Sequence, residues 1–108
     1  MIDNYKKYLF LFSHPDDETL GCGGVLSNLK TKKKDVTVAF SNVGVTSRND
    51  KKIKNNLLIL RENTFKALKH YNIKKNKVYF GEFEDNEIDK NTLLKLIKWV
   101  EKLINIVK

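Results

Sequence analysis

The chain has 108 residues, of which 31% are charged and 41% hydrophobic, and its 21 Lys and Arg against 13 Asp and Glu give a formal net charge of +8. That length suits one domain or part of one, and the composition excludes a disordered chain. Cys22 is the only cysteine, which excludes an internal disulfide and favours a reducing, cytoplasmic compartment. No apolar run approaches the roughly 18 residues of a membrane span, so we expect no membrane-spanning segment.

The positive charge comes almost entirely from lysine, because only Arg48 and Arg61 are arginines. The densest groups, in residues 32–34 and 74–77, fall where we expect connections between a helix and a strand. Nucleic-acid binding needs clustered cations, and no recognised binding module or interleaved aromatic platform accompanies these. We interpret the lysines as a solvated surface and predict no nucleic-acid partner.

The first half of the chain predicts a strand, a helix and a second strand. Residues 8–12 form an apolar run typical of a strand covered on both faces, and Pro15 requires that strand to end. Residues 17–33 predict a helix, and residues 36–40 predict a β-branched second strand. Residues 42–50 are rich in turn formers and predict a loop. The apolar residues expected on the buried side of the helix are Leu20, Val25, Leu26 and Leu29.

The second half predicts a helix over residues 55–71, a short strand over 78–80, an acidic loop over 82–87 and a last helix from about Asn91. We expect the helix over 55–71 to bury Leu57, Leu58, Leu60, Phe65 and Leu68. In the last helix, apolar residues recur at intervals of three and four and predict a buried stripe. These residues are Leu93, Ile97, Val100, Ile104 and Val107.

The predicted order is therefore βαβαβα, which favours an α/β fold with a Rossmann-like parallel sheet and right-handed crossovers. The last helix has an apolar stripe but leads into no further strand. We therefore interpret residues 1–108 as one domain that resembles the N-terminal half of a doubly wound fold.

The most chemically dense segment is His14-Pro15-Asp16-Asp17-Glu18, directly after the first predicted strand. Ligands of open α/β sheets bind beyond the carboxyl ends of the strands. An imidazole and a carboxylate suit zinc, and a further carboxylate could take a proton from metal-bound water. A plain helix N-terminus with favourable dipole contacts is an alternative. That alternative does not explain why several carboxylates crowd together, since they repel one another unless a cation is present.

The segment from Ser13 to Gly24, SHPDDETLGCGG, strongly resembles the opening motif of the PIG-L/LmbE-like N-deacetylases. These zinc-dependent enzymes hydrolyse the N-acetyl group of substrates that contain GlcNAc. The similarity continues in residues 42–46, Arg61-Glu62 and residues 83–86. It implies the fold of an LmbE-like domain over residues 1–108, truncated at its C-terminus.

The resemblance also implies roles for individual residues. His14 and Asp17 correspond to zinc ligands of a single Zn²⁺ site, and Asp16 corresponds to the catalytic general base. Arg61 corresponds to an arginine that contacts the N-acetylated amino-sugar substrate. Asp85 corresponds to an acid near the sugar, although a solvated loop acid explains it equally well.

The chain departs from the family pattern in its ligand set. Catalytic zinc usually takes three protein ligands, and the resemblance places the third in a later histidine motif that this chain lacks. No histidine follows His70, which we interpret as a favourable charge near the end of its helix.

Two hypotheses follow from this departure. One hypothesis is that the chain is the N-terminal part of a metal-dependent N-deacetylase. The alternative is a non-catalytic Rossmann-like module that binds a sugar or a nucleotide. In the first case we expect self-association or marginal stability, because a sheet edge is left unpaired.

The glycines of the motif have a separate interpretation. Gly21, Gly23 and Gly24 do not fit the G-x-G-x-x-G dinucleotide fingerprint. We expect them to let the first helix approach the sheet closely, with Cys22 as a small core residue.

Overall fold

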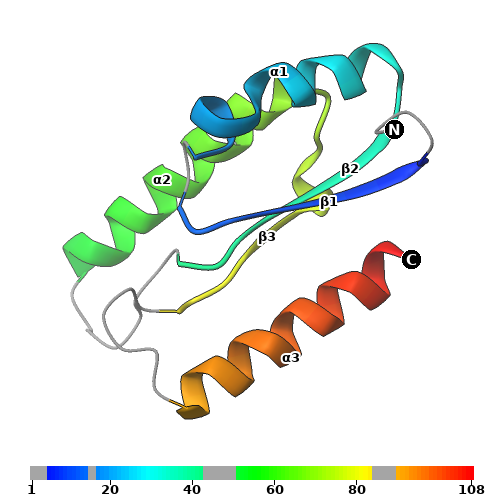
Figure 1. The fold of residues 1–108 in the computed structure, drawn as a ribbon. Coiled ribbons are helices and arrows are strands. Elements are labelled where there is room, and N and C mark those ends of the chain that lie inside the picture. Colours follow the sequence, from blue (N-terminus) through cyan, green and yellow to red (C-terminus); the bar gives the residue numbers. More distant parts are fainter. Residues whose placement is uncertain (1–4, 15–16, 43–50, 84–89) are drawn as a thin grey trace.

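The computed structural model describes residues 5–14, 17–42, 51–83 and 90–108, and within these ranges the side chains of residues 17–22, 51–54 and 90–91 are not described. The elements are strands β1 (Lys7–Phe12), β2 (Asp35–Phe40) and β3 (Val78–Phe80), and helices α1 (Asp17–Thr31), α2 (Lys51–Lys69) and α3 (Lys90–Val107). The predicted βαβαβα order is confirmed (Figure 1). Helix α2 begins four residues before the predicted start, and a 3-10 turn over Lys75–Lys77 precedes β3.

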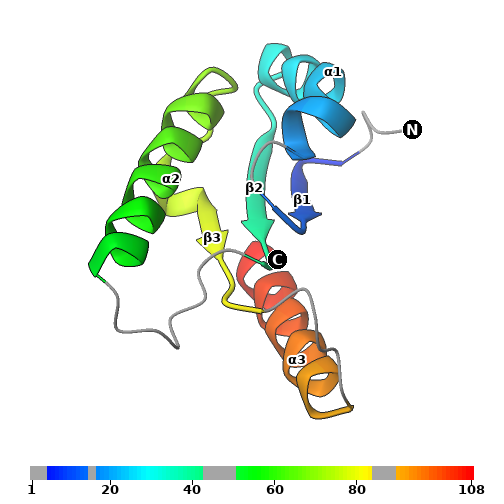
Figure 2. The ribbon, with the colours of Figure 1, turned by 90° about the vertical axis from the view of Figure 1, so that its left-hand side faces the viewer.

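The three strands form one parallel sheet in the order β1-β2-β3. Helices α1 and α2 cover one face of this sheet, whereas α3 lies against the other face (Figures 1 and 2). The strand register places Phe12 beside Phe40 and Phe40 beside Phe80, so the last residues of the strands form one row. Because parallel strands all point the same way, their carboxyl ends meet at one edge.

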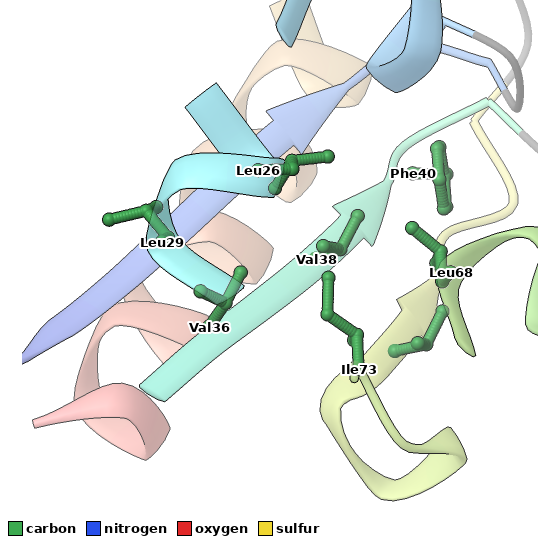
Figure 3. Packing of buried hydrophobic residues seen from close by; sticks show 8 residues of the cluster. Leu26, Leu29, Val36, Val38, Phe40, Leu68 and Ile73 are labelled. Atoms are coloured by element: carbon green, nitrogen blue, oxygen red, sulfur yellow. The ribbon is translucent and has the colours of Figure 1, made fainter. Parts of the chain in front are cut away.

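The hydrophobic core lies between the sheet and the helices α1 and α2 (Figure 3). Leu26 and Leu29 from α1 and Leu68 from α2 are almost completely buried there, as predicted. Both Val38 and Phe40 of the central strand β2 are fully buried, because helices and flanking strands surround that strand. Every second residue of β1 joins the same cluster, namely Tyr8, Phe10 and Phe12.

Part of the predicted burial in α2 is wrong. Leu58 is 61% exposed and Leu60 is 37% exposed, while Leu68 on the same helix is buried. Only the side of α2 that faces the sheet is covered, and the polar Thr64 belongs to it, with its hydroxyl donating to the carbonyl of Leu60 at 2.8 Å. The sequence pattern alone suggested a wider apolar face than the sheet can cover.

The predicted stripe of α3 is also partly wrong. Leu93, Ile97 and Ile104 are 45%, 45% and 44% exposed, whereas the neighbouring Leu103 is 2% exposed. Helix α3 is apolar around more than half of its circumference, and β1 covers one side of it. The expected stripe lies next to the side that is covered.

The expected close approach to the sheet is not found at Gly23 or Gly24 of α1. A Cβ atom at Gly23 would meet only the Tyr71 hydroxyl at 3.6 Å, and at Gly24 it would meet nothing within 4 Å. Both positions have room for a side chain, because α1 is not pressed against the sheet at these two residues. Gly21 and Cys22 lie among the residues whose side chains are not described.

No helix in the described ranges is long and apolar enough to cross a membrane.

Candidate functional site

Main-chain hydrogen bonds join the segments that follow the three strands. The Ser41 N–H donates to the Phe12 carbonyl at 2.9 Å, and the Asn42 N–H donates to the Ser13 carbonyl at 2.8 Å. On the other side, the Phe83 N–H donates to the Ser41 carbonyl at 3.0 Å. Main-chain hydrogen bonds therefore hold the three segments together for one to three residues beyond the sheet. We call these residues, 13, 41–42 and 81–83, the ledge.

Gly81 is what allows the segment after β3 to approach this ledge. A Cβ atom at this position would lie 2.7 Å from the Ser41 carbonyl oxygen, which is closer than real Cβ contacts allow. The Gly81 N–H also donates to the Phe40 carbonyl at 2.6 Å. Sequence analysis did not single out Gly81, although its position directly after an apolar strand is a signal for close backbone contact.

His14 lies at this edge, two residues after the end of β1, and its side chain is exposed. Asp17 is the first residue of α1, so the two predicted metal ligands lie on either side of residues 15–16, which are not described. The position of the Asp17 side chain is not described, and Asp16 lies outside the described residues. The predicted division of roles between these two aspartates therefore stays a prediction.

Arg61 lies on α2, and its side chain approaches the same edge from the face of the sheet that α1 and α2 cover. Its guanidinium carbon is 5.1 Å from the centre of the Phe80 ring, in a cation–π contact. Its Nε atom is buried and has no hydrogen-bond partner among the described residues. Because β2 lies between β1 and β3, the strand that leads into His14 and the strand that carries Phe80 are roughly 10 Å apart.

The other predicted residues do not join this group. Asp85 lies outside the described residues. His70 lies just after α2, and its carbonyl accepts a hydrogen bond from Lys30 Nζ near the end of α1. Helices α1 and α2 both run back to the amino edge of the sheet, so His70 and His14 lie at opposite edges. His70 therefore cannot share a metal ion with His14.

A small pocket of about 200 Å³ lies at the carboxyl edge on the α3 side of the sheet. Its walls come from the strand ends and from α3, and the lining residues are Leu11, Phe12, Ser13, Ser41, Leu96, Trp99 and Val100. The Trp99 ring also packs against Phe83, with ring centres 5.6 Å apart. Trp99 thus fills space between α3 and the ledge, which agrees with a packing role for this side chain.

A larger pocket of about 390 Å³ lies at the opposite, amino edge. Lysines from both helix-to-strand connections line it, namely Lys30, Lys33, Lys34, Lys74 and Lys77, together with Asp35. Lys30 Nζ donates to the His70 carbonyl at 2.6 Å, and Lys77 Nζ lies 3.3 Å from an Asp35 carboxylate oxygen. Cations here face the negative ends of α1 and α2, which favours positive charge at this edge.

The described residues contain no group of three or more His, Cys, Asp or Glu side chains that could hold a metal ion. The turn between β1 and α1 nevertheless provides an imidazole and a carboxylate within four positions, and that donor pair suits zinc.

Comparison with known proteins agrees with this fold. The family model described as PIG-L, GlcNAc-PI de-N-acetylase, matches residues 9–108. The N,N′-diacetylchitobiose deacetylase of Pyrococcus horikoshii, solved with an inhibitor, superposes with a TM-score of 0.71 at 23% identity, and the match covers 94% of this chain and 39% of that one. A conserved protein of Thermus thermophilus superposes with a TM-score of 0.59 at 20% identity, over 92% of this chain and 43% of that one. A search of curated protein sequences finds no match.

Proposed function

The chain belongs to the PIG-L family of GlcNAc-PI de-N-acetylases, and from this membership we propose that it contributes the β1–α1 part of the active site of an N-deacetylase. The reaction is hydrolysis of the acetamide of a GlcNAc-type amino sugar or glycoconjugate, which releases acetate and a free amine. The observation that carries the proposal is the family match together with the position of the His14–Asp17 turn at the carboxyl edge of the sheet. The chain spans about two-fifths of the length of the solved structures it matches. The activity of a complete active site is therefore proposed here and is not shown by the match.

His14 and Asp17 would hold one zinc ion in this turn. When bound, zinc acidifies a water molecule and polarises the amide carbonyl. The third protein ligand would come from polypeptide outside these 108 residues, because His70 lies at the other edge of the sheet.

Asp16 would act as the general base. It lies between the two ligands in the sequence, so its carboxylate can stay off the metal and accept a proton from the attacking water. The departing amine also needs a proton, and the group that would deliver it is not among the residues assigned here.

Arg61 would contact the amino-sugar substrate. Phe80 holds its guanidinium at the edge of the sheet by a cation–π contact, and its buried Nε–H has no acceptor among the described residues. A buried donor without an acceptor is costly, so an acceptor on a bound ligand would stabilise this arrangement. Asp85 would supply a further hydrogen-bonding group to the sugar.

The proposal is tested by amine release from N-acetylglucosamine and N,N′-diacetylchitobiose, with the zinc content measured on the same preparation. The protein is prepared as its gene encodes it, and a chelator-treated sample serves as the control. We expect amine release that the chelator abolishes and that added zinc restores. Sugar binding without amine release in the zinc-loaded protein would instead favour the non-catalytic binding module.

A further inference from the structure

We propose that the cavity at the amino edge of the sheet binds a small anion that carries two or more phosphate groups. This cavity of about 390 Å³, which we call the amino-edge cavity, is lined by residues of the two helix-to-strand connections, within 30–36 and 71–77. Its volume lies in the range of about 300–1,000 Å³ that is usual for small-molecule sites. The proposal does not depend on the proposed function, because His14 lies at the opposite edge of the sheet.

The two connections that form the walls begin with the same turn. After α1, the Lys34 N–H donates to the Leu29 carbonyl at 3.0 Å, and after α2, the Ile73 N–H donates to the Leu68 carbonyl at 3.2 Å. Such turns satisfy carbonyls at the end of a helix through the main chain. The lysines of the cavity are therefore not needed as hydrogen-bond donors to these carbonyls.

The positive charge of the amino-edge cavity exceeds what the fold itself balances. The charged residues that line it are Lys30, Lys33, Lys34, Asp35, Lys74 and Lys77. They carry five positive charges and one negative charge, and the ends of α1 and α2 together add about one more negative charge. A surplus of about three positive charges remains among the lining groups. Because like charges repel one another, a bound anion with several negative charges would stabilise this arrangement.

Two of these lysines are available to a ligand. Lys77 Nζ lies 3.3 Å from an Asp35 carboxylate oxygen, and Lys30 Nζ donates to the His70 carbonyl. By contrast, neither Lys33 nor Lys74 has a hydrogen-bond or ion-pair partner among the described residues, and both are exposed. One of them comes from each connection, so they lie on the two walls of the cavity.

Lys33 occupies a position that the main chain favours for glycine. Its φ angle is 56°, in the left-handed region that residues with a Cβ atom rarely adopt. Glycine is the usual residue at this point of a helix end. Glycine would place no cation at the cavity, so a ligand that binds the Lys33 ammonium group would offset the strain of this conformation.

The floor of the amino-edge cavity is apolar and belongs to the hydrophobic core. Val36 and Ile73 are 8% and 4% exposed, and Tyr71 beside them is half-buried. A cleft with cations around an apolar, low-dielectric wall concentrates the electric field and attracts anions. The cations line a cavity and do not form a stripe along the surface, which favours a compact anion over a polymer.

The experiment titrates the protein, as its gene encodes it, with sodium pyrophosphate at a constant ionic strength of about 0.15 M. Amide chemical shifts are followed by NMR, and the melting temperature is measured by circular dichroism. We expect saturable shifts confined to residues 30–36 and 71–77, and a rise in the melting temperature of at least about 4 °C at saturation. Shifts that spread along the chain without saturating would mean an ion atmosphere only and would overturn the proposal.

Two double variants that each remove two positive charges make the result specific. Lys33→Gln combined with Lys74→Gln should weaken pyrophosphate binding at least about tenfold, because it removes two charged hydrogen-bond donors. Lys95→Gln combined with Lys98→Gln, at exposed positions of α3, should change the affinity less than about twofold. Pyrophosphate also binds metal ions, but that effect would be the same in both variants. Equal affinities in the two variants would contradict the proposal.

Lys33→Gly separates binding from folding, because its two expected effects have opposite signs. Glycine relieves the left-handed conformation, so the melting temperature of the free protein should rise by at least about 2 °C. Pyrophosphate binding should weaken at least about threefold in the same variant, because one charged donor is lost. Unchanged affinity in Lys33→Gly would overturn the proposal, whatever the stability of the variant.

Discussion

The guanidinium of Arg61 rests on the ring of Phe80, 5.1 Å from its centre, at the carboxyl edge of the sheet. Phe80 in turn stacks on Phe40, and Phe40 stacks on Phe12, with ring centres 5.8 and 5.9 Å apart. This row connects the last residues of all three strands. It fixes the position of a cation from α2 relative to the strand that leads into His14.

Replacing Arg61 by Met should keep most of the aliphatic packing and remove the charge. We expect the free energy of unfolding to fall by about 1 kcal/mol, because a partly buried cation–π contact contributes about 0.5–2 kcal/mol. If Arg61 also binds the sugar, KM for the N-acetylated substrate should rise in the same variant. Urea unfolding and steady-state kinetics measure the two effects.

Lys75→Met is the matched control. Lys75 Nζ lies 5.2 Å from the centre of the Phe65 ring, but its side chain is 69% exposed. Water weakens this contact, so we expect the free energy of unfolding to change by less than about 0.5 kcal/mol. Equal losses in the two variants would contradict a special role for the Arg61–Phe80 contact.

Two leucines of α2 should respond very differently to the same substitution. Leu68→Ala removes a fully buried side chain, and we expect the free energy of unfolding to fall by about 2–5 kcal/mol. Leu58→Ala removes a side chain that is 61% exposed, and we expect a change of no more than about 0.5 kcal/mol. Chemical denaturation measures both. A large loss in Leu58→Ala would mean that the outer face of α2 is covered in solution.

Two glycines should respond with opposite sign to substitution by alanine. Gly24→Ala should raise the free energy of unfolding by up to about 1 kcal/mol, because Ala favours a helix more than Gly does and the position has open space. Gly81→Ala should lower it, because the new Cβ would collide with the Ser41 carbonyl. Thermal and urea unfolding provide the comparison, and a neutral Gly81→Ala would refute the close approach at the ledge.

The proposed division of roles in the β1–α1 turn makes a separate prediction. Asp16→Asn should retain zinc but lose at least about a hundredfold in kcat, the scale of general-base catalysis. His14→Ala should lose zinc as well, because it removes a ligand. Metal content and amine release on the same samples check this.

Asp35→Asn is the matched control for Asp16→Asn. Asp35 is an exposed acid at the amino edge, where it pairs with Lys77, so its substitution should leave both zinc content and kcat unchanged. Equal loss of metal in Asp16→Asn and His14→Ala would show that Asp16 is itself a ligand.

The sequence by itself determined the order of the elements and the place of the candidate site. Short apolar runs predict strands, spacings of three and four predict helices, and Pro15 predicts that the first strand ends before it, as β1 does at Phe12. These are local properties, so they can be read along the chain. The two dense lysine groups were also placed correctly, because each occurs in a helix-to-strand connection.

Only the tertiary structure decided which side of each helix is covered. Ile97 and Leu103 look equally suited to a core, yet one is 45% exposed and the other 2%, since burial depends on where β1 lies. The contact of Arg61 with Phe80 and the close approach at Gly81 likewise depend on strand register and on residues far apart in the chain. Local patterns determine what an element is, whereas its neighbours determine what that element touches.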